Sequence, residues 1–104
     1  MALQGEIILD NGIVLSSGYL LVIHVDMNYI VNDNNANIRV LIYKDSSAYS
    51  SGKPEVIELE HTVNSSDFDT YFSETVLKQV NKTNLTQAYV WLKTLSQYSS
   101  LTEV

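Results

Sequence analysis

The feature that most constrains the fold is a nine-residue segment, 19–27, in which every second residue is apolar. A period of two is typical of a β-strand with one face on a hydrophobic core. The other parity begins with Leu20 and Val22 and ends with His24 and Asp26. We therefore expect a strand that is covered on both faces at its start and wet on one face at its end. The expected uninterrupted apolar face consists of Tyr19, Leu21, Ile23, Val25 and Met27.

Three further segments alternate in the same way, and polar turns separate them. After the first, residues 3–9, the step Asn11-Gly12 favours a tight turn, so the short segment Ile13–Leu15 is expected to return as a hairpin strand. Ser16-Ser17-Gly18 is expected to end that strand. Strands joined by short polar loops usually pair antiparallel. The remaining predicted strands are 38–44, with Ile38, Val40 and Ile42 on one side, and 55–63, with Ile57, Leu59, His61 and Val63 facing the core.

Helical spacing replaces the alternation in the C-terminal part of the chain. Ser66 and Asp69 fit the start of a capped helix, although residues 75–77 also suit a strand. In the last helix Asn84 is the expected cap and Gln87 its reciprocal partner. The expected apolar stripe consists of Leu85, Ala88, Tyr89, Leu92 and Leu95, with Trp91 and Lys93 outside it.

These patterns predict one α+β domain over residues 1–104, since 104 residues suffice for one core and are too few for two. The expected architecture is an antiparallel β-sheet or small β-sandwich with a C-terminal α-helix packed on it. From the spacing of the apolar residues, strands are expected in about residues 3–63 and helices in about residues 67–97.

Composition excludes several classes of function. The chain has no cysteine, which excludes a disulfide scaffold, a thiolate zinc site and a cysteine nucleophile. Its formal charge of −6 argues against nonspecific binding to nucleic acid or to an anionic membrane. No apolar run approaches the roughly 20 residues of a membrane span, and residues 1–6 do not have the pattern of a signal peptide.

Few residues suggest chemistry. His24, His61 and Asp26 are a conceivable metal set, but their spacing matches no metal motif, so a half-exposed His24 and a packed His61 are favoured. Glu58 and Glu60 lie on one strand face, as a glycosidase pair would, although a wet strand face usually carries charge. The segment Asn32–Asn37 lacks the ordered acids of a calcium loop. We expect no enzyme activity, no metal and no cofactor.

Tyrosine is the unusual component, with seven copies. Tyrosine and tryptophan are enriched where proteins meet partners, and tyrosine is also a strand former. We single out Tyr98, Tyr49 and Trp91 as candidates for a partner interface. An exposed edge strand, with Ile13–Leu15 as the candidate, is a second route to association, including pairing with another copy of the chain.

Several short segments resemble small proteins encoded in the tail and baseplate gene clusters of long-tailed, siphovirus-type bacteriophages. A Bacillus phage is the suggested source. The segments are Leu9-Asp10-Asn11-Gly12-Ile13, Tyr43-Lys44-Asp45, Ser51-Gly52-Lys53-Pro54, Phe68-Asp69-Thr70-Tyr71-Phe72-Ser73 with Val76-Leu77, and Gln87-Ala88-Tyr89-Val90-Trp91-Leu92-Lys93-Thr94.

The resemblance implies a non-enzymatic protein that docks to a phage tail or baseplate protein, in the virion or in the host cytoplasm during assembly. The chain is also similar to the N-terminal shoulder domain of lactococcal phage receptor-binding proteins, a β-sandwich with a helix that attaches to the baseplate. The family supplies no functional residues to transfer. Two alternatives stay open, namely a phage accessory protein that binds carbohydrate and one that binds a host factor.

Overall fold

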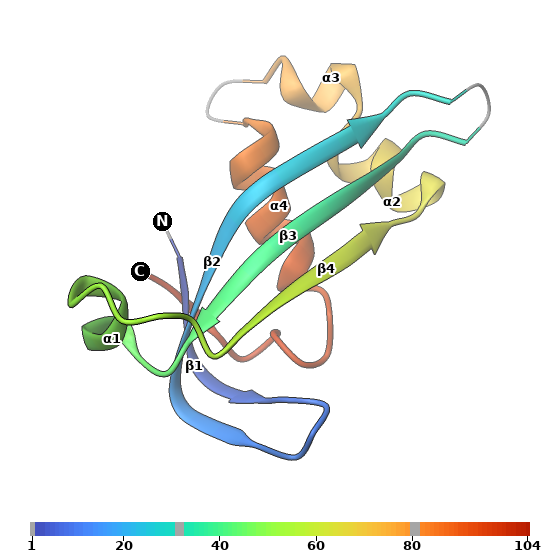
Figure 1. Cartoon of the computed structure of the whole chain (residues 1–104). Coiled ribbons are helices and arrows are strands. Elements are labelled where there is room, and N and C mark those ends of the chain that lie inside the picture. Colours follow the sequence, from blue (N-terminus) through green and yellow to red (C-terminus); the bar gives the residue numbers. More distant parts are fainter. Residues whose placement is uncertain (1, 31–32, 80–81) are drawn as a thin grey trace.

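The computed structural model describes residues 2–30, 33–79 and 82–104 and has the expected α+β class (Figure 1). One five-stranded antiparallel sheet, of order β4-β3-β2-β1-β5, forms the centre. The strands are β1 (Leu3–Ile8), β2 (Val14–Asn28), β3 (Asn35–Tyr43), β4 (Ile57–Val63) and β5 (Thr102–Glu103). The helices are α1 (Ser46–Ser50), α2 (Ser65–Tyr71), α3 (Glu74–Leu77) and α4 (Asn84–Leu92).

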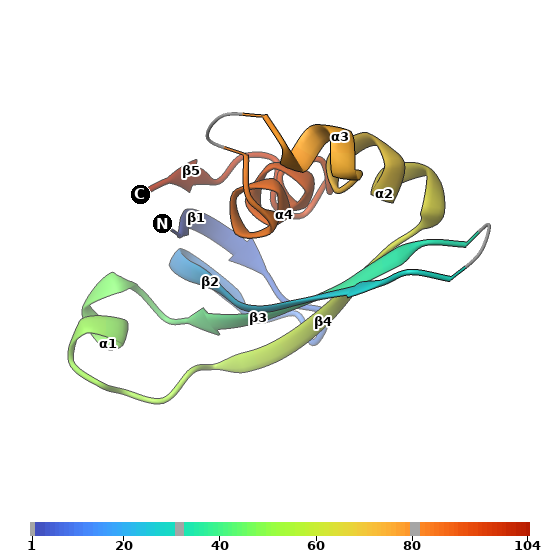
Figure 2. The ribbon, with the colours of Figure 1, turned by 90° about the horizontal axis from the view of Figure 1, so that it is seen from above.

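The helices α2, α3 and α4 cover one face of the sheet, and α1 lies beyond the end of β3 (Figure 2). Among the described residues, α1 is the only helix on the opposite face, at one end, where Tyr49 contacts Tyr19 and Tyr43. The first and last described residues lie side by side, because the backbones of Ala2 and Val104 exchange two hydrogen bonds next to the β1–β5 pair. The arrangement is therefore a single sheet with a helical layer, and α4 packs on it as the sequence predicts.

The prediction of one uninterrupted apolar face on residues 19–27 is wrong, because β2 contains a β-bulge. The register with β3 shifts between Val22 and His24. A bulge inserts one residue and so moves the following side chains to the other face. Leu20 and Val22 are buried before it, and Val25 and Met27 pack against the same core after it. The predicted face is thus divided, with Ile23 exposed on the far side of the sheet.

The strand β2 is continuous through Ser16-Ser17-Gly18, so the prediction of a strand end there is wrong. Gly18 pairs with Gly5, and the register with β1 shifts between Gly5 and Ile7. A Cβ atom on Gly18 would lie 2.8 Å from Ile7 Cδ1. A glycine here allows the buried Ile7 side chain to lie against the backbone of β2, which explains a glycine within a strand.

Local hydrogen bonds place the helix starts differently from the prediction. Thr83, not Asn84, caps α4, and the Thr86 side chain completes the capping box in place of Gln87. The Asn64 side chain caps α2 by accepting from the backbone N–H of Asp67. A hydroxyl or amide in the residue before the first turn satisfies an amide that has no partner within the helix.

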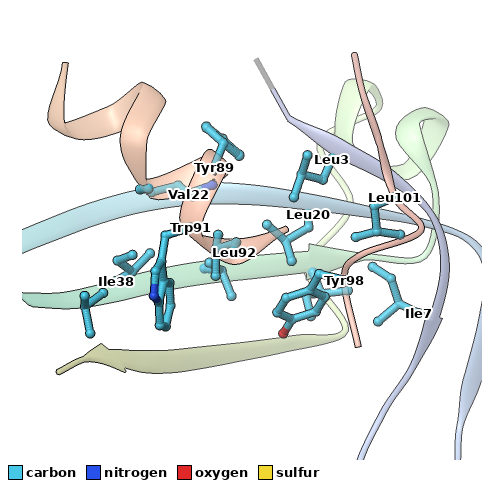
Figure 3. Close-up of a cluster of buried hydrophobic side chains, with 14 of the residues drawn as sticks. Leu3, Ile7, Leu20, Val22, Ile38, Tyr89, Trp91, Leu92, Tyr98 and Leu101 are labelled. Carbon is cyan, nitrogen blue, oxygen red and sulfur yellow. Dashed lines mark hydrogen bonds between the residues drawn. The ribbon is translucent and has the colours of Figure 1, made fainter. Parts of the chain in front are cut away.

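The buried face of α4 also differs from the predicted stripe. Leu85 is exposed, whereas Trp91 is buried and its indole nitrogen donates to Asp67 Oδ2 at 3.0 Å. Gln87 is buried as well, and its amide donates to the carbonyl of Tyr71 at 2.9 Å. Both residues face α2 through a hydrogen bond, so α4 packs against a helix as well as against the sheet. The side chains of α4 and β2 interdigitate in the core (Figure 3).

Candidate functional site

A cleft of about 460 Å³ opens between the end of β1, the strand β4 and the segment that follows α4. These parts belong to distant stretches of the sequence, and the close-up shows Tyr98 lying between Ile7 and β4 (Figure 3). The walls are largely apolar, and polar groups from the β1–β2 turn and from β4 interrupt them. The lining residues are Ile7, Ile8, Leu9, Asp10, Asn11, Ile57, Leu59, Glu60, His61, Gln97 and Tyr98.

A hydrogen bond between His61 and Tyr98 lies in the wall of this cleft. His61 Nε2 and the Tyr98 hydroxyl are 2.8 Å apart, and the two rings meet edge to face with centroids 5.3 Å apart. The alternation of β4 turns His61 toward the core face, as the sequence predicts, and the turn after α4 brings Tyr98 onto it. The pair joins β4 to the C-terminal segment.

Both members of this pair are neutral at pH 7. Burial raises the pKa of Tyr98 to about 12; a hydrogen bond from Gln97 lowers it in part and the charge of Asp10 raises it. Desolvation lowers the pKa of His61 below its usual value of 6.5, against a smaller raising effect of Asp10. Because burial disfavours the charged form of each group, the wall presents an uncharged imidazole and an uncharged phenol.

The turn between β1 and β2 forms the acidic side of the cleft. Gly12 has a φ of +88°, and its amide donates to the carbonyl of Leu9 at 2.9 Å. Asn11 Oδ1 accepts from the amide of Ile13 at 3.1 Å. These bonds fix the turn and leave Asp10 exposed, next to the cleft. The predicted hairpin is therefore confirmed, and its turn contributes a carboxylate to the site.

The hairpin also carries a second feature, which we call the hairpin surface. It consists of Ile8, Ile13 and Val14, which are 60%, 49% and 53% exposed. The strand β3 pairs with β2 only from Tyr19 onward. In the described part of the chain, the side of β2 from Val14 to Gly18 that faces away from β1 therefore has no strand beside it.

The three predicted interface residues lie in different environments. Tyr98 and Trp91 are 2% and 4% exposed, so both are core residues and not surface residues. Both side chains can be buried because the polar atom of each has a hydrogen-bond partner inside the fold. Tyr49 is 41% exposed on α1, where it stacks on Tyr19 at 5.1 Å. Only Tyr49 of the three presents a substantial surface.

The outer face of the sheet holds the other charged candidates. Arg39 lies between Glu58 and Glu60, at 3.8 and 3.5 Å, so these acids share a face and form a cross-strand ion pair with one base. His24 Nε2 lies 3.1 Å from Asp26 on this outer face, whereas His61 faces the core. The two histidines therefore lie on opposite faces and do not converge on one metal.

The candidate calcium loop is described only in part. Asn32, the first residue of the segment considered as a calcium loop, lies outside the described residues. No cluster of three or more His, Cys, Asp or Glu side chains with metal-binding geometry occurs among residues 2–30, 33–79 and 82–104. Within those ranges, none of the helices has the length and apolar character needed to cross a bilayer.

Sequence reasoning missed the cleft as a whole. The signals were His61 on a buried parity and an acid in the hairpin turn, but nothing in the sequence brings β4, the turn and Tyr98 together. No known family profile matches the chain, and no curated protein or solved structure is significantly similar to it.

Proposed function

We propose that this protein is a non-enzymatic docking protein of the tail or baseplate region of a bacteriophage. The observation that carries the docking role is the hairpin surface, where exposed apolar side chains adjoin a strand edge without a partner. The resemblance of several sequence segments to small phage tail-region proteins supports the biological setting. The proposed location is the virion, or the host cytoplasm during assembly.

The hairpin surface has the physical properties of a docking site. Ile8 and Val14 are directly opposite each other in the β1–β2 ladder, so their side chains form one apolar area. Beside them, the free side of β2 offers backbone amides and carbonyls to an added strand. Burial of a large aliphatic side chain contributes about 1.5–3 kcal/mol relative to exposure. A partner strand would gain hydrogen bonds and apolar contact together.

The proposed partner is a phage tail or baseplate protein. The net charge of −6 favours a partner with a basic contact surface. Pairing of two copies of this chain through the same edge is the competing occupant, and size-exclusion chromatography with light scattering distinguishes it. A monomer that binds a tail protein supports the proposal, and a stable dimer that binds none contradicts it.

The decisive experiment combines particle analysis with pull-down. Tagged wild-type protein is used to capture the separately expressed tail and baseplate proteins of its phage, and purified particles are searched for the chain by mass spectrometry. Val14→Lys places a charge on the hairpin surface, and we expect it to lose the captured protein. Ile23→Lys is the matched control, because Ile23 is an exposed apolar residue of the same strand outside that surface.

The expected result is capture by wild type and Ile23→Lys and loss in Val14→Lys. Equal capture by both variants would contradict docking through the hairpin surface. Absence of the chain from particles, together with no captured tail component, would contradict the tail-region role itself.

A further inference from the structure

The cleft beside the hairpin has the dimensions of a small-molecule site. Its volume of about 460 Å³ lies within the roughly 300–1,000 Å³ typical of ligand pockets. Its apolar walls are formed by aliphatic side chains from two strands and the turn between β1 and β2. Such walls with a few polar groups are the usual composition of a ligand site. The aliphatic residues are Ile7, Ile8, Leu9, Ile57 and Leu59.

The hydrogen bond of Tyr98 determines what His61 offers to a ligand. Tyr98 is buried, and His61 Nε2 is the one hydrogen-bond acceptor that the described residues offer to its hydroxyl. The proton of Tyr98 is then directed to His61 Nε2, at 2.8 Å. A neutral imidazole whose Nε2 accepts carries its proton on Nδ1. His61 Nδ1–H is therefore a hydrogen-bond donor.

That donor is accessible. His61 Nδ1 has no hydrogen-bond partner among the residues that the structure describes. In that same part of the chain, no buried side-chain nitrogen or oxygen lacks a partner. Since Nδ1 has none, solvent must reach it, and His61 lines the cleft. A ligand in the cleft therefore meets a neutral N–H group.

The complementary group is the carboxylate of Asp10. It forms no ion pair or hydrogen bond with any other described residue, and its charge acts on both His61 and Tyr98. An ionised carboxylate only accepts hydrogen bonds. Glu60, the other acid at the cleft, is paired with Arg39 on the outer face. The cleft thus combines one free acceptor, one free donor and the amides of Asn11 and Gln97.

This combination discriminates between ligand classes. An anion would be repelled by Asp10, and no basic side chain lines the described cleft to offset that. A simple cation would pair with Asp10 but leave the N–H of His61 without an acceptor, and a hydrocarbon would leave both groups unpaired. A hydroxyl group both donates and accepts, so it suits this pair of groups.

We propose that the cleft binds a neutral polyhydroxylated ring of the sugar type. Hydroxyl groups of the ring donate to Asp10 and accept from His61 Nδ1–H, while its C–H groups lie on the aliphatic walls. The proposal does not depend on the docking role, since it uses the cleft and not the exposed side chains of Ile13 and Val14. It gives the carbohydrate-binding alternative a defined location.

The test is an NMR titration of the full chain with single probes. Glucose, galactose, rhamnose and N-acetylglucosamine are added separately, and n-butylammonium and acetate serve as charged probes. We expect at least one sugar to shift the backbone signals of residues 7–11 and the ring signals of His61 and Tyr98. The free protein is expected to show the Nδ1–H tautomer of His61 in a long-range ¹⁵N–¹H spectrum.

Asp10→Ala is the matched variant, because the Asp10 side chain makes no hydrogen bond that the turn requires. We expect sugar affinity to fall about tenfold or more, the usual effect of losing a hydrogen bond to a charged group. Asp69→Ala removes an exposed carboxylate of α2 and is expected to leave affinity unchanged.

Several results would overturn the proposal. These are shifts with n-butylammonium or acetate and none with sugars, no shift with any probe, an Nε2–H tautomer, and equal loss of affinity in both variants. Each leaves the docking proposal untouched, because that is tested by Val14→Lys and Ile23→Lys.

Discussion

The hydroxyl of Tyr89, on α4, accepts a hydrogen bond from the backbone amide of Val22 at 2.9 Å. Val22 is the residue at which the ladder between β2 and β3 shifts register. A buried amide without a partner is costly. The phenol of Tyr89 supplies a partner to this amide from the helical layer. Figure 3 shows these two residues next to each other at the contact between α4 and β2.

Replacement of Tyr89 by Phe is expected to destabilise the fold. The substitution keeps the ring and leaves the buried amide of Val22 without this acceptor, which costs about 1–3 kcal/mol. Urea unfolding followed by circular dichroism measures the change in the free energy of unfolding. Tyr29→Phe is the control, because the Tyr29 side chain is largely exposed. An equal, near-zero effect of both substitutions would show that the amide of Val22 does not need the phenol.

Gly18→Ala tests the close approach of Ile7 to β2. The added Cβ atom would lie 2.8 Å from Cδ1 and 3.0 Å from Cγ1 of Ile7, so this buried side chain would have to shift. Overpacking of this kind costs about 1–3 kcal/mol. In the Ile7→Val background, where Cδ1 is absent, we expect a smaller loss. A double-mutant cycle with no coupling between the two sites would contradict the contact.

Asp67→Ala tests the link between α2 and α4. Trp91 Nε1 donates to Asp67 Oδ2 at 3.0 Å, and the loss of a charged acceptor for a buried donor costs about 1.5–3 kcal/mol. Since the chain has one tryptophan, its fluorescence reports on this site directly. Asp69→Ala, in the same helix, is expected to leave stability and the emission maximum nearly unchanged. Equal destabilisation by both substitutions would show that the effect comes from the lost charge on α2 and not from the hydrogen bond of Trp91.

The pH dependence of stability tests the environment of His61. Desolvation lowers its pKa in the folded state below 6.5, so the unfolded chain binds a proton at a higher pH than the folded chain. This contribution to stability is complete above pH 6.5 and is lost as the pH falls toward the folded pKa. Urea unfolding at pH 7.5 and 5.5 measures it. His61→Gln is expected to show a smaller decrease than wild type, and an equal decrease would contradict the assignment.

The sequence predicted much of the fold correctly because alternation reports directly on burial. Ile38, Val40 and Ile42 are buried as expected, and β4 turns Glu58 and Glu60 outward. It failed where a single residue changes the register. The bulge after Val22 moves the following residues of β2 to the other face, and no residue type in the sequence indicates it.

The sequence also indicated which aromatic residues are notable, but not whether they lie in the core or at the surface. Trp91 and Tyr98 are buried because Asp67 and His61 satisfy their polar atoms, and these partners are far away in the chain. Pattern alone cannot distinguish such a residue from one that faces a partner, since both are amphipathic.

The sequence by itself determined the α+β class, the β1–β2 hairpin and the order of the strands along the chain. These follow from local periodicity and from the conformational preference of Asn11-Gly12. Only the tertiary structure decided the continuous β2, its bulge, and the meeting of Asp10, His61 and Tyr98 in one cleft. The physical reason is that those features depend on contacts between residues distant in sequence, whose energies no local pattern contains.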